Sequence, residues 1–393
     1  MLHPLMAECG RRTETAGARE GDQGLVRALC AWYAREARDL PWRRLDDPYA
    51  IWICETMCQQ TRIETVIPYW ERFLAELPDP AALAAVEEDR LLGLWSGLGY
   101  YSRARRLREA ARVIVSEHGG KLPRTAEQLR ELPGIGPYTA GAVASIAFGE
   151  RAPLVDGNVA RVLCRLEGHE APLGSGELRR TLERRTADLV ARTTRGRFGP
   201  GSWNQALMEL GALICTPRQP SCLLCPARDR CRARSQGDPE RLPVPAPKPE
   251  KIEVRLEVFW IQRHDRILLA KRPAGGRMAS LLELPTREHP CGPDATTYLW
   301  PAKIGLPGLR EVRELGEVPH GITRHRIRAR VIRAACRASA LTKPAAPFRW
   351  VPLDGLDDLP LTGLARKILA RDFEDGPRAR GGARRVGFGN PRP

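Results

Sequence analysis

Four cysteines close together in the chain are its most specific chemical signal. Cys215, Cys222, Cys225 and Cys231 follow the spacing C-x6-C-x2-C-x5-C. Thiolates gathered in so short a stretch repel one another unless a cation holds them. Zinc sites usually present two separated C-x2-C pairs, whereas this stretch has one. The spacing therefore favours a [4Fe-4S] cluster over a zinc ion, and either of these over four unligated thiols.

Two carboxylates have settings that suit cleavage of a glycosidic bond. The reaction passes through a cationic sugar, so it needs an acid for the leaving group and an anion near the sugar. Glu55 follows Asp47 and Pro48, which are typical of a helix start. Asp156 precedes another helical stripe, where the helix N-terminus stabilises an anion. Taken alone, an ordinary surface glutamate and a capping aspartate are the commoner interpretations.

A glycine-bearing turn precedes Asp156. The stretch LPGIGPYTAGAVASIAFG places Gly134 and Gly136 in a tight turn that leads into an alanine-rich helix. Glycine permits positive φ and close backbone approach, and amides at such a helix start bind a DNA phosphate without reading sequence. The pattern predicts a helix-hairpin-helix module, although any glycine-rich helix connection has a similar composition.

The elements that position these residues fall into two domains. Short helical segments separated by Pro and Gly fill residues 25–231, for example 91–95, 103–118 and 178–190. The stretch RLPVPAPKPE, residues 241–250, predicts an extended connector. After it, apolar residues alternate with polar ones, which predicts half-buried strands in residues 252–261, 265–272 and 325–336. We therefore expect an all-α domain followed by an α+β domain.

Composition narrows the class of protein. The net charge of +16 predicts attraction to polyanions such as DNA or RNA, and no apolar run is long enough to cross a bilayer. The cysteines do not follow the pattern of a secreted disulfide framework. Residues 1–22 lack the apolar core of a secretory signal and contain acidic residues that disfavour a transit peptide, so we expect a disordered leader. The Gly-, Arg- and Pro-rich residues 375–393 predict a disordered basic tail.

Several stretches between residues 25 and 231 resemble, in order, the MutY family of adenine DNA glycosylases, which belongs with endonuclease III to one superfamily. They are LPWRRLDDPYAIWICETMCQQTRIETVIPYWERF, WSGLGYYSRARRL, LPGIGPYTAGAVASIAFG, VDGNVARVL and the cysteine spacing. The resemblance implies that Glu55 protonates a flipped adenine and then positions water, and that Asp156 stabilises the sugar cation or traps it covalently. It implies that Tyr138 and Asn158 support this pair. For Glu55 to be protonated at neutral pH its pKa must be raised, and an apolar wall such as Trp42 or Ile51 would do this.

The same resemblance implies further contacts with DNA and with the base. Trp42 and Arg43 would line the base pocket, while Gln60, Thr61 and Tyr100 would contact DNA where the extruded base leaves a gap. A tyrosine can wedge between bases and a glutamine can hydrogen-bond to the orphaned partner. Tyr100 is equally suited to a core position between helices.

One departure separates this chain from endonuclease III. Those enzymes carry a lysine, which forms a Schiff base with the sugar, where this chain has Tyr138. The sequence has no lysine between Lys121 and Lys248. We therefore expect a monofunctional glycosylase, which hydrolyses the bond without cleaving the strand.

The second domain resembles the Nudix-like C-terminal domain of the MutY family. The resemblance lies in GRMASLLELP, residues 276–285, and the following TREHPCGPD has too few glutamates for a magnesium-binding hydrolase box. The fold would instead recognise 8-oxoguanine opposite the adenine. The family's recognition loop carries Phe-Ser-His, whereas this chain has Thr323, Arg324 and His325. Thr323 would replace the serine hydroxyl, and Arg324 or His325 the histidine.

These inferences combine into one expectation about the whole chain. It comprises a leader (1–22), a glycosylase domain with its cluster loop (23–235), a linker (236–250), a Nudix-like recognition domain (251–374) and a tail (375–393). We expect a cytoplasmic, nucleoid-associated bacterial monomer that acts on double-stranded DNA with adenine opposite 8-oxoguanine or guanine. Two alternatives are a noncatalytic DNA-damage-binding protein and a glycosylase for another mispaired base.

Overall fold

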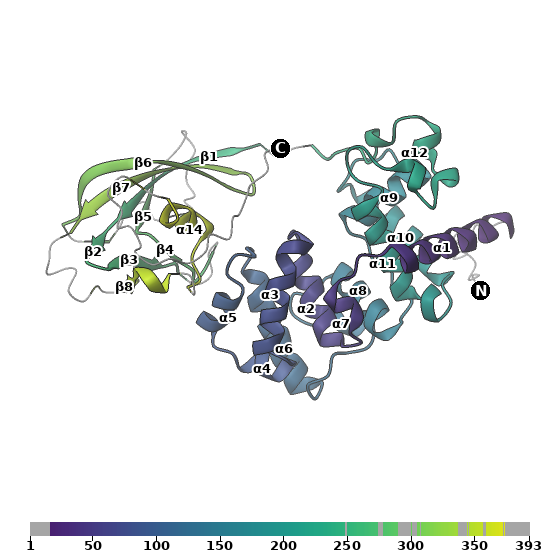
Figure 1. Ribbon diagram of the computed structural model, residues 1–393, viewed down its shortest axis with the longest axis horizontal. Coiled ribbons are helices and arrows are strands. Elements are labelled where there is room, and N and C mark those ends of the chain that lie inside the picture. The colour runs from purple at the N-terminus through teal and green to yellow at the C-terminus, as the bar shows by residue number, and fades with distance from the viewer. Residues whose placement is uncertain are drawn as a thin grey trace, which may run out of the picture. The chain divides into compact units, whose positions relative to one another are not determined.

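The computed structural model divides the chain into two compact units (Figure 1). The first comprises Met1–Val86 with Arg105–Lys248, and the second Glu87–Ala104 with Pro249–Pro393. The structure describes residues 16–247, 250–273, 278–289, 300, 305–306, 308–336, 344, 346–356, 359–371 and 373. Within the described residues, no helix is long and apolar enough to cross a membrane.

Helices are the only regular elements of the first unit over its described residues. They are α1 (Ala16–Glu36), η1 (Pro41–Arg44), α2 (Pro48–Cys58), α3 (Ile63–Glu76), α4 (Pro80–Ala85), α6 (Ser102–Glu117), α7 (Ala126–Leu129), α8 (Pro137–Phe148), α9 (Gly157–Glu167), α10 (Gly176–Ala191), η2 (Gly196–Phe198), α11 (Pro200–Leu213), η3 (Cys222–Leu224), η4 (Arg228–Arg230), α12 (Arg232–Ser235) and η5 (Pro239–Arg241). The helical segments expected at 103–118 and 178–190 correspond to α6 and α10.

One apolar core joins α1, α8, α9, α10 and α11. Its fully buried members include Leu29, Leu163, Trp203 and Leu207, and each buried side chain of this size stabilises the fold by roughly 1.5–3 kcal/mol. The backbones approach closely at Gly141 of α8, where a Cβ would lie 2.2 Å from the Pro153 carbonyl oxygen. The core thus fixes the starts of α8 and α9 relative to each other.

The structure differs from the expected bounds at both ends of this unit. Helix α1 already begins at Ala16, inside the expected disordered leader, and Asp22 accepts two 2.6 Å hydrogen bonds from Arg185. The start of the expected linker is also packed: Leu242 is buried and its carbonyl accepts a bond from Arg165 Nε at 2.8 Å. Ion pairing and burial order these segments despite their polar or proline-rich composition. Residues 1–15 and 374–393 lie outside the described residues, and with them most of the leader and the expected tail.

The second unit is a two-sheet α+β fold (Figure 1). One sheet has the order β5-β1-β7-β6, with β1 and β7 parallel; in the other, β3 pairs with β2, β4 and β8. Helix α14 shares one apolar core with both sheets. The elements are α5 (Glu88–Leu94), β1 (Ile252–Trp260), β2 (Gln262–Arg263), β3 (Arg266–Lys271), β4 (Leu282–Glu283), β5 (Thr286–His289), β6 (Arg310–Ile322), β7 (His325–Ala335), β8 (Phe348–Pro352), η6 (Leu353–Gly355) and α14 (Gly363–Leu369).

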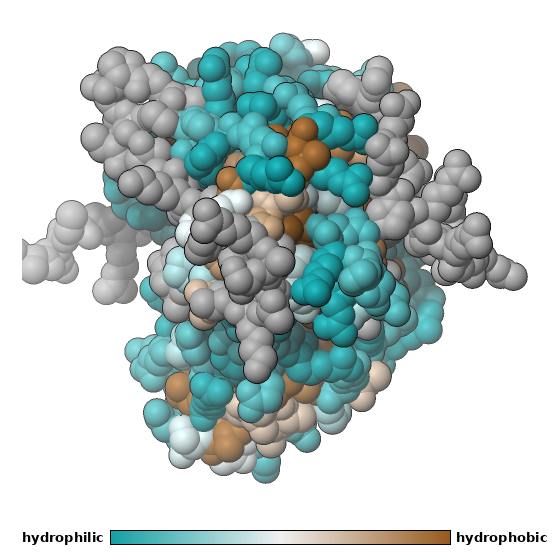
Figure 2. Space-filling model, turned by 90° about the vertical axis from the view of Figure 1, so that its left-hand side faces the viewer, coloured by the Kyte–Doolittle hydropathy of each residue, from teal (hydrophilic) through white to brown (hydrophobic). Residues whose placement is uncertain are grey.

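The alternation of apolar and polar residues correctly predicted the strands that have one buried and one exposed face. On β7, Ile327, Ala329 and Val331 are buried while Arg326 and Arg328 are exposed, and β1 and β3 also match their expected positions. Strand β6 lacks this signal because it is rich in charged residues, contains Pro319 and has register shifts near Gly316. The face in Figure 2 accordingly shows mostly hydrophilic side chains, with hydrophobic ones in separate patches.

Candidate active site

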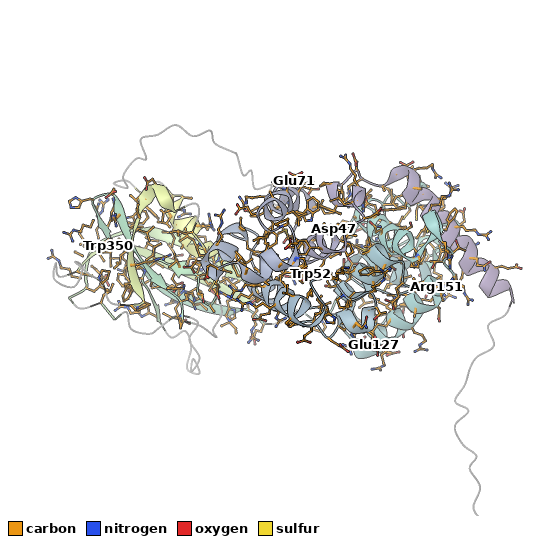
Figure 3. All side chains as sticks on the ribbon, turned by 90° about the horizontal axis from the view of Figure 1, so that it is seen from below. Asp47, Trp52, Glu71, Glu127, Arg151 and Trp350 are labelled. Carbon is orange, nitrogen blue, oxygen red and sulfur yellow. The ribbon has the colours of Figure 1, made fainter. Side chains whose placement is uncertain are left out.

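Glu55 is a buried acid on α2. The helix starts as its sequence predicts: Asp47 caps it by accepting a bond from the Tyr49 amide at 2.9 Å, and Pro48 occupies the first turn. All residues from Tyr49 to Met57 are buried, and Figure 3 labels Trp52 on this helix and the exposed Asp47 just before it. Glu55 itself is 8% exposed. The interpretation as an ordinary surface glutamate is therefore wrong.

Tyr138 of α8 holds the Glu55 carboxyl group. Its hydroxyl donates a hydrogen bond to Glu55 Oε2 at 2.8 Å. The pKa of Glu55 is raised to about 7: burial is the largest cause and the charge of Asp156 adds to it, while the bond from Tyr138 and the charge of Arg43 oppose the rise. A carboxyl group with this pKa can donate a proton near neutral pH.

Asp156 is the second carboxylate and caps α9. Its Oδ1 accepts a bond from the Val159 amide at 2.7 Å, and its Oδ2 accepts a longer one from Asn158 Nδ2 at 3.4 Å. Burial raises the pKa of Asp156, whereas these bonds and the charge of Arg161 favour its anion. The helix start therefore stabilises a negative charge in a half-buried position, as the sequence predicted.

Arg161 connects this carboxylate to the cysteine-bearing loop. Its guanidinium donates to Asn158 Oδ1 at 2.8 Å and to the Gly211 and Cys215 carbonyl oxygens at 2.7 and 2.8 Å. Gly211 permits the close packing, since a Cβ there would lie 2.6 Å from Asn158 Cβ. Arg161 was not predicted from the sequence, although its position three residues after Asn158 on a helix favours this contact.

The two residues expected in the base pocket have different surroundings. Trp42 is buried and packs edge to face against Trp70, with ring centroids 5.7 Å apart. Arg43 lies over the Tyr33 ring and forms an ion pair with Glu209 at 2.9 Å. Sequence analysis missed Tyr33 and Glu209, because they lie on α1 and α11, far from α2 in the chain.

The glycine hairpin has the expected form. It joins α7 to α8, and Gly134 adopts a φ of +79°, with no room for a Cβ, which would lie 2.5 Å from Arg106 Cβ. Gly136 caps α8 with a φ of −86°, so only the first of the two glycines needs the left-handed region. Its position leaves the first amides of α8 available to a phosphate.

The residues expected to contact DNA are at least partly accessible. Gln60 is exposed with a φ of +57°, just beyond α2, and the neighbouring Gln59 is anchored by a bond from its Nε2 to Thr139 Oγ1 at 3.0 Å. Thr61 is half-buried. In the second unit, Tyr100 is 53% exposed with a φ of +47°, so its interpretation as a core residue is wrong.

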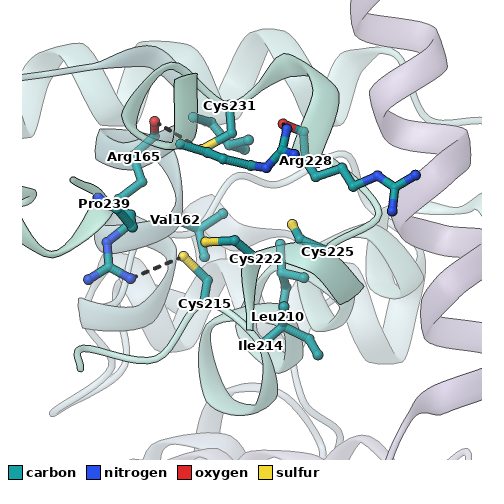
Figure 4. A pocket seen from close by; sticks show the side chains of 12 residues that line it. Val162, Arg165, Leu210, Ile214, Cys215, Cys222, Cys225, Arg228, Cys231 and Pro239 are labelled. Atoms are coloured by element: carbon teal, nitrogen blue, oxygen red, sulfur yellow. Dashed lines mark hydrogen bonds between the residues drawn. The ribbon is translucent and has the colours of Figure 1, made fainter. Parts of the chain in front are cut away.

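The four cysteines surround a common hollow lined also by Val162, Arg165 and Ile214 (Figure 4). The pKa of Cys225 is raised to about 11, chiefly by burial and also by the charges of the other three thiolates, so a cation is needed to hold all four as thiolates. Among the described residues, no three ligating side chains are close enough to hold a single metal ion. Four sulfur donors around one hollow are the donor set that a metal-sulfur cluster requires.

The expected recognition loop is the turn between β6 and β7. Thr323 and Arg324 are exposed at its tip, and Thr323 has a φ of +51°. His325 is instead 7% exposed and its ring Nδ1 lies 3.3 Å from the Ile322 carbonyl oxygen. Of the two candidates to replace the family's histidine, Arg324 is thus the accessible one. The related segment 276–285 is described only from Met278 onward.

The helical fold and its glycine hairpin define a helix-hairpin-helix protein. A family model described as "HhH-GPD superfamily base excision DNA repair protein" matches residues 53–187, and a NUDIX domain model matches residues 257–371. Among curated relatives, an adenine DNA glycosylase of Schizosaccharomyces pombe is 32% identical over 66% of this chain and 68% of its own length. One of Mycobacterium tuberculosis is 42% identical over 54% of this chain and 68% of its own. The chain belongs to the adenine DNA glycosylase family.

The match to longer relatives is partial. The human adenine DNA glycosylase is 47% identical over 55% of this chain, but only 40% of its own length is covered. The chain thus spans about two fifths to a half of the mammalian and plant relatives it matches.

Proposed function

We propose that this chain removes adenine from double-stranded DNA in which the adenine faces 8-oxoguanine or guanine. One observation carries the proposal: a buried carboxyl group with a pKa near neutrality, Glu55, is held by Tyr138 and lies close enough to Asp156 to feel its charge. An acid and an anion in one pocket are what departure of a base from a cationic sugar requires. Family membership supports adenine as the base.

The two carboxyl groups have distinct roles because their surroundings differ. Glu55 is protonated below about pH 7, so it donates a proton to the departing adenine and, as an anion, then positions the attacking water. Asp156 accepts hydrogen bonds at a helix start, so its anion stabilises the positive charge that develops on the sugar. Tyr138 and Asn158 fix the two groups without reacting themselves.

The adenine must leave the base stack to reach this pocket. The exposed Tyr100 is suited to wedge into the base stack. The exposed Gln60 is suited to hydrogen-bond to the orphaned partner base, and the half-buried Thr61 lies next to it in the chain. The first amides of α8, presented after Gly134 and Gly136, bind a backbone phosphate. The protein has Tyr138 rather than a lysine in the hairpin helix, so water rather than an amine attacks the sugar, and the product is an intact strand with an abasic site.

Members of this family generally carry a [4Fe-4S] cluster, and Cys215, Cys222, Cys225 and Cys231 would hold it here. A bound cluster would supply the positive charge that four thiolates need and would order the loop that contains them. Through Arg161, this loop is linked to Asn158 beside the catalytic aspartate. We place its role in structure rather than in the reaction.

Selectivity for the lesion would come from the second unit. Thr323 offers a hydroxyl and Arg324 a guanidinium at an exposed turn, and these are the donors that recognition of an altered guanine edge needs. Within this proposal the chain acts as a monomer, and residues 251–374 recognise the lesion while residues 23–235 excise the base.

The purified chain should be tested on duplexes with adenine opposite 8-oxoguanine, guanine or thymine. We expect release of free adenine from the first two, with strand scission only after alkali. A Thr323→Ala, Arg324→Ala double variant should lose much of the preference for 8-oxoguanine. Tight binding to all duplexes without base release would establish a noncatalytic DNA-damage-binding protein. Release of a base other than adenine would establish a glycosylase for another mispaired base.

A further inference from the structure

Glu209 is a buried carboxylate that takes no part in the proposed reaction. It lies on α11, and its side chain is 2% exposed. Five donors reach it: the Arg38 amide at 2.9 Å, Arg38 Nε and NH2 at 2.9 and 2.8 Å, and Arg43 NH1 and NH2 at 3.2 and 2.9 Å. Burial alone would raise the pKa of Glu209, but these bonds outweigh it and lower the pKa to about 2. Glu209 is therefore an anion at any working pH.

Glu209 leaves the Arg43 guanidinium little freedom. Two of its nitrogens are bonded to the carboxylate, and NH1 also donates to the Arg38 carbonyl oxygen at 2.9 Å. The Tyr33 ring lies 5.2 Å below the guanidinium carbon. The Tyr33 hydroxyl is in turn bonded to Gln205 Oε1 at 3.0 Å. Hydrogen bonds thus hold one edge of the Arg43 guanidinium, and the Tyr33 ring packs against one of its faces.

Arg43 is close enough to the proposed acid for its charge to act on it, and one of its donors is unused. Its charge acts on Glu55 and lowers the pKa of that carboxyl group. Its Nε is buried and has no hydrogen-bond partner among the described residues. A buried donor without a partner is costly, so the bonds from the other two guanidinium nitrogens to Glu209 are what hold Arg43 in this position.

We propose that Glu209 is a positioning residue of the excision site, which fixes the Arg43 guanidinium beside the Glu55 carboxyl group and neutralises its charge. The inference rests on the proposed role of Glu55 in excision. Without the Glu209 anion, the charge of Arg43 would act on Glu55 uncompensated, and Arg43 would be free to pair with Glu55 directly. Either change would deprotonate the acid at a lower pH.

The other groups that face Glu55 do not provide this compensation. They are Tyr138 from α8, Asp156 at the start of α9, Tyr33 from α1 and the neighbouring thiol of Cys54 on α2, whose pKa burial raises well above its usual value. Tyr138 and Tyr33 are neutral at working pH because burial raises the pKa of each tyrosine. Asp156 is itself needed as an anion by the sugar. Arg43 is thus the cation whose charge must be balanced, and Glu209 is bonded to it.

The test is the pH dependence of single-turnover adenine release from a duplex with adenine opposite 8-oxoguanine. In Glu209→Gln, the midpoint of the alkaline fall in rate should drop by about half to one pH unit, with the rate at acidic pH retained within about threefold. Arg43→Gln should move the midpoint upward, and the double variant should return it toward the wild-type value. Glu209→Asp, which keeps the carboxylate, should restore the wild-type midpoint in part.

Glu283→Gln is a matched control, because Glu283 is a comparably buried carboxylate paired with Arg272 in the second unit. It should leave the midpoint unchanged. A uniformly lower rate in Glu209→Gln with an unchanged midpoint would overturn the inference, and if that variant does not fold, an unchanged midpoint in Arg43→Gln would do so. Should the wild-type chain release no adenine at any pH, the proposed function fails instead.

Discussion

The Tyr138 hydroxyl lies 2.8 Å from Glu55 Oε2, although the two residues are 83 positions apart in the chain. This contact joins α8, whose first amides are proposed to bind a phosphate, to α2, which carries the proposed acid. If the hairpin binds DNA as proposed, a shift of α8 would move the hydroxyl that holds the Glu55 carboxyl group. We therefore expect binding of the phosphate backbone and orientation of the acid to be coupled through Tyr138.

The first prediction concerns pH. Since burial raises the pKa of Glu55 to about 7 and the protonated form is the active one, adenine release should be constant below that pH and fall about tenfold per unit above it. Single-turnover rates between pH 5.5 and 9 would measure the fall. A rate that rises through this range would show that an ionised group, rather than a protonated one, assists the base.

Tyr138→Phe should move this fall to higher pH. The hydroxyl bond stabilises the Glu55 anion, so its loss raises the pKa of Glu55 further, by about half to one unit. The plateau rate should also decrease, because the carboxyl group loses an orienting partner. Tyr49→Phe is the control. Tyr49 lies on α2, as Glu55 does, and its hydroxyl donates a buried bond to the Leu77 carbonyl oxygen, so its loss should leave the pH midpoint of the rate unchanged.

Glu55→Gln should stabilise the fold, but only at high pH. The pKa of Glu55 is raised on folding, so the stability that its protonated form contributes is fully present below about pH 4.5 and is lost as pH rises through about 7. The neutral glutamine avoids this loss and should gain about 2–3 kcal/mol at pH 8 relative to the wild type. Urea unfolding at pH 5 and pH 8 would test it. An equal difference at both pH values would contradict burial of an ionisable Glu55.

Gly211→Ala should weaken both the fold and catalysis. The new Cβ would lie 2.6 Å from Asn158 Cβ, so α11 and the start of α9 must separate, at a cost of about 1–3 kcal/mol. Because Asn158 and Asp156 share that helix start, adenine release should also fall. Gly176→Ala, where the Cβ meets only the mobile end of Arg180 at 3.3 Å, should change neither by much. Normal catalysis in Gly211→Ala would show that the start of α9 tolerates displacement.

Structural features that depend on neighbouring residues could be predicted from the sequence, whereas contacts between distant parts of the chain could not. The start of α2 at Asp47 and Pro48 and the cap of α9 at Asp156 are encoded by adjacent residues, so they could be predicted. The partnership of Glu209 with Arg43 spans 166 positions and depends on how α11 packs, so it could not. Strand β6 was missed because its charged residues do not alternate regularly with apolar ones.

Burial was the other quantity that local pattern did not determine. Glu55 and Gln60 are five positions apart, yet one is buried and the other exposed, because α2 ends at Cys58 and the chain turns at Gln60. His325 and Arg324 differ in the same way at the β6–β7 turn. In both cases the end of an element, which sequence patterns locate poorly, decides which side chain reaches solvent.

The most direct test of the account is the rate of adenine release from a duplex with adenine opposite 8-oxoguanine by the wild type and by Glu55→Gln, measured with enzyme in excess. The account predicts a loss of at least about 100-fold in Glu55→Gln, with the Kd for the duplex unchanged within about threefold. Release by Glu55→Gln at a rate within tenfold of the wild type would contradict the assignment of Glu55 as the catalytic acid.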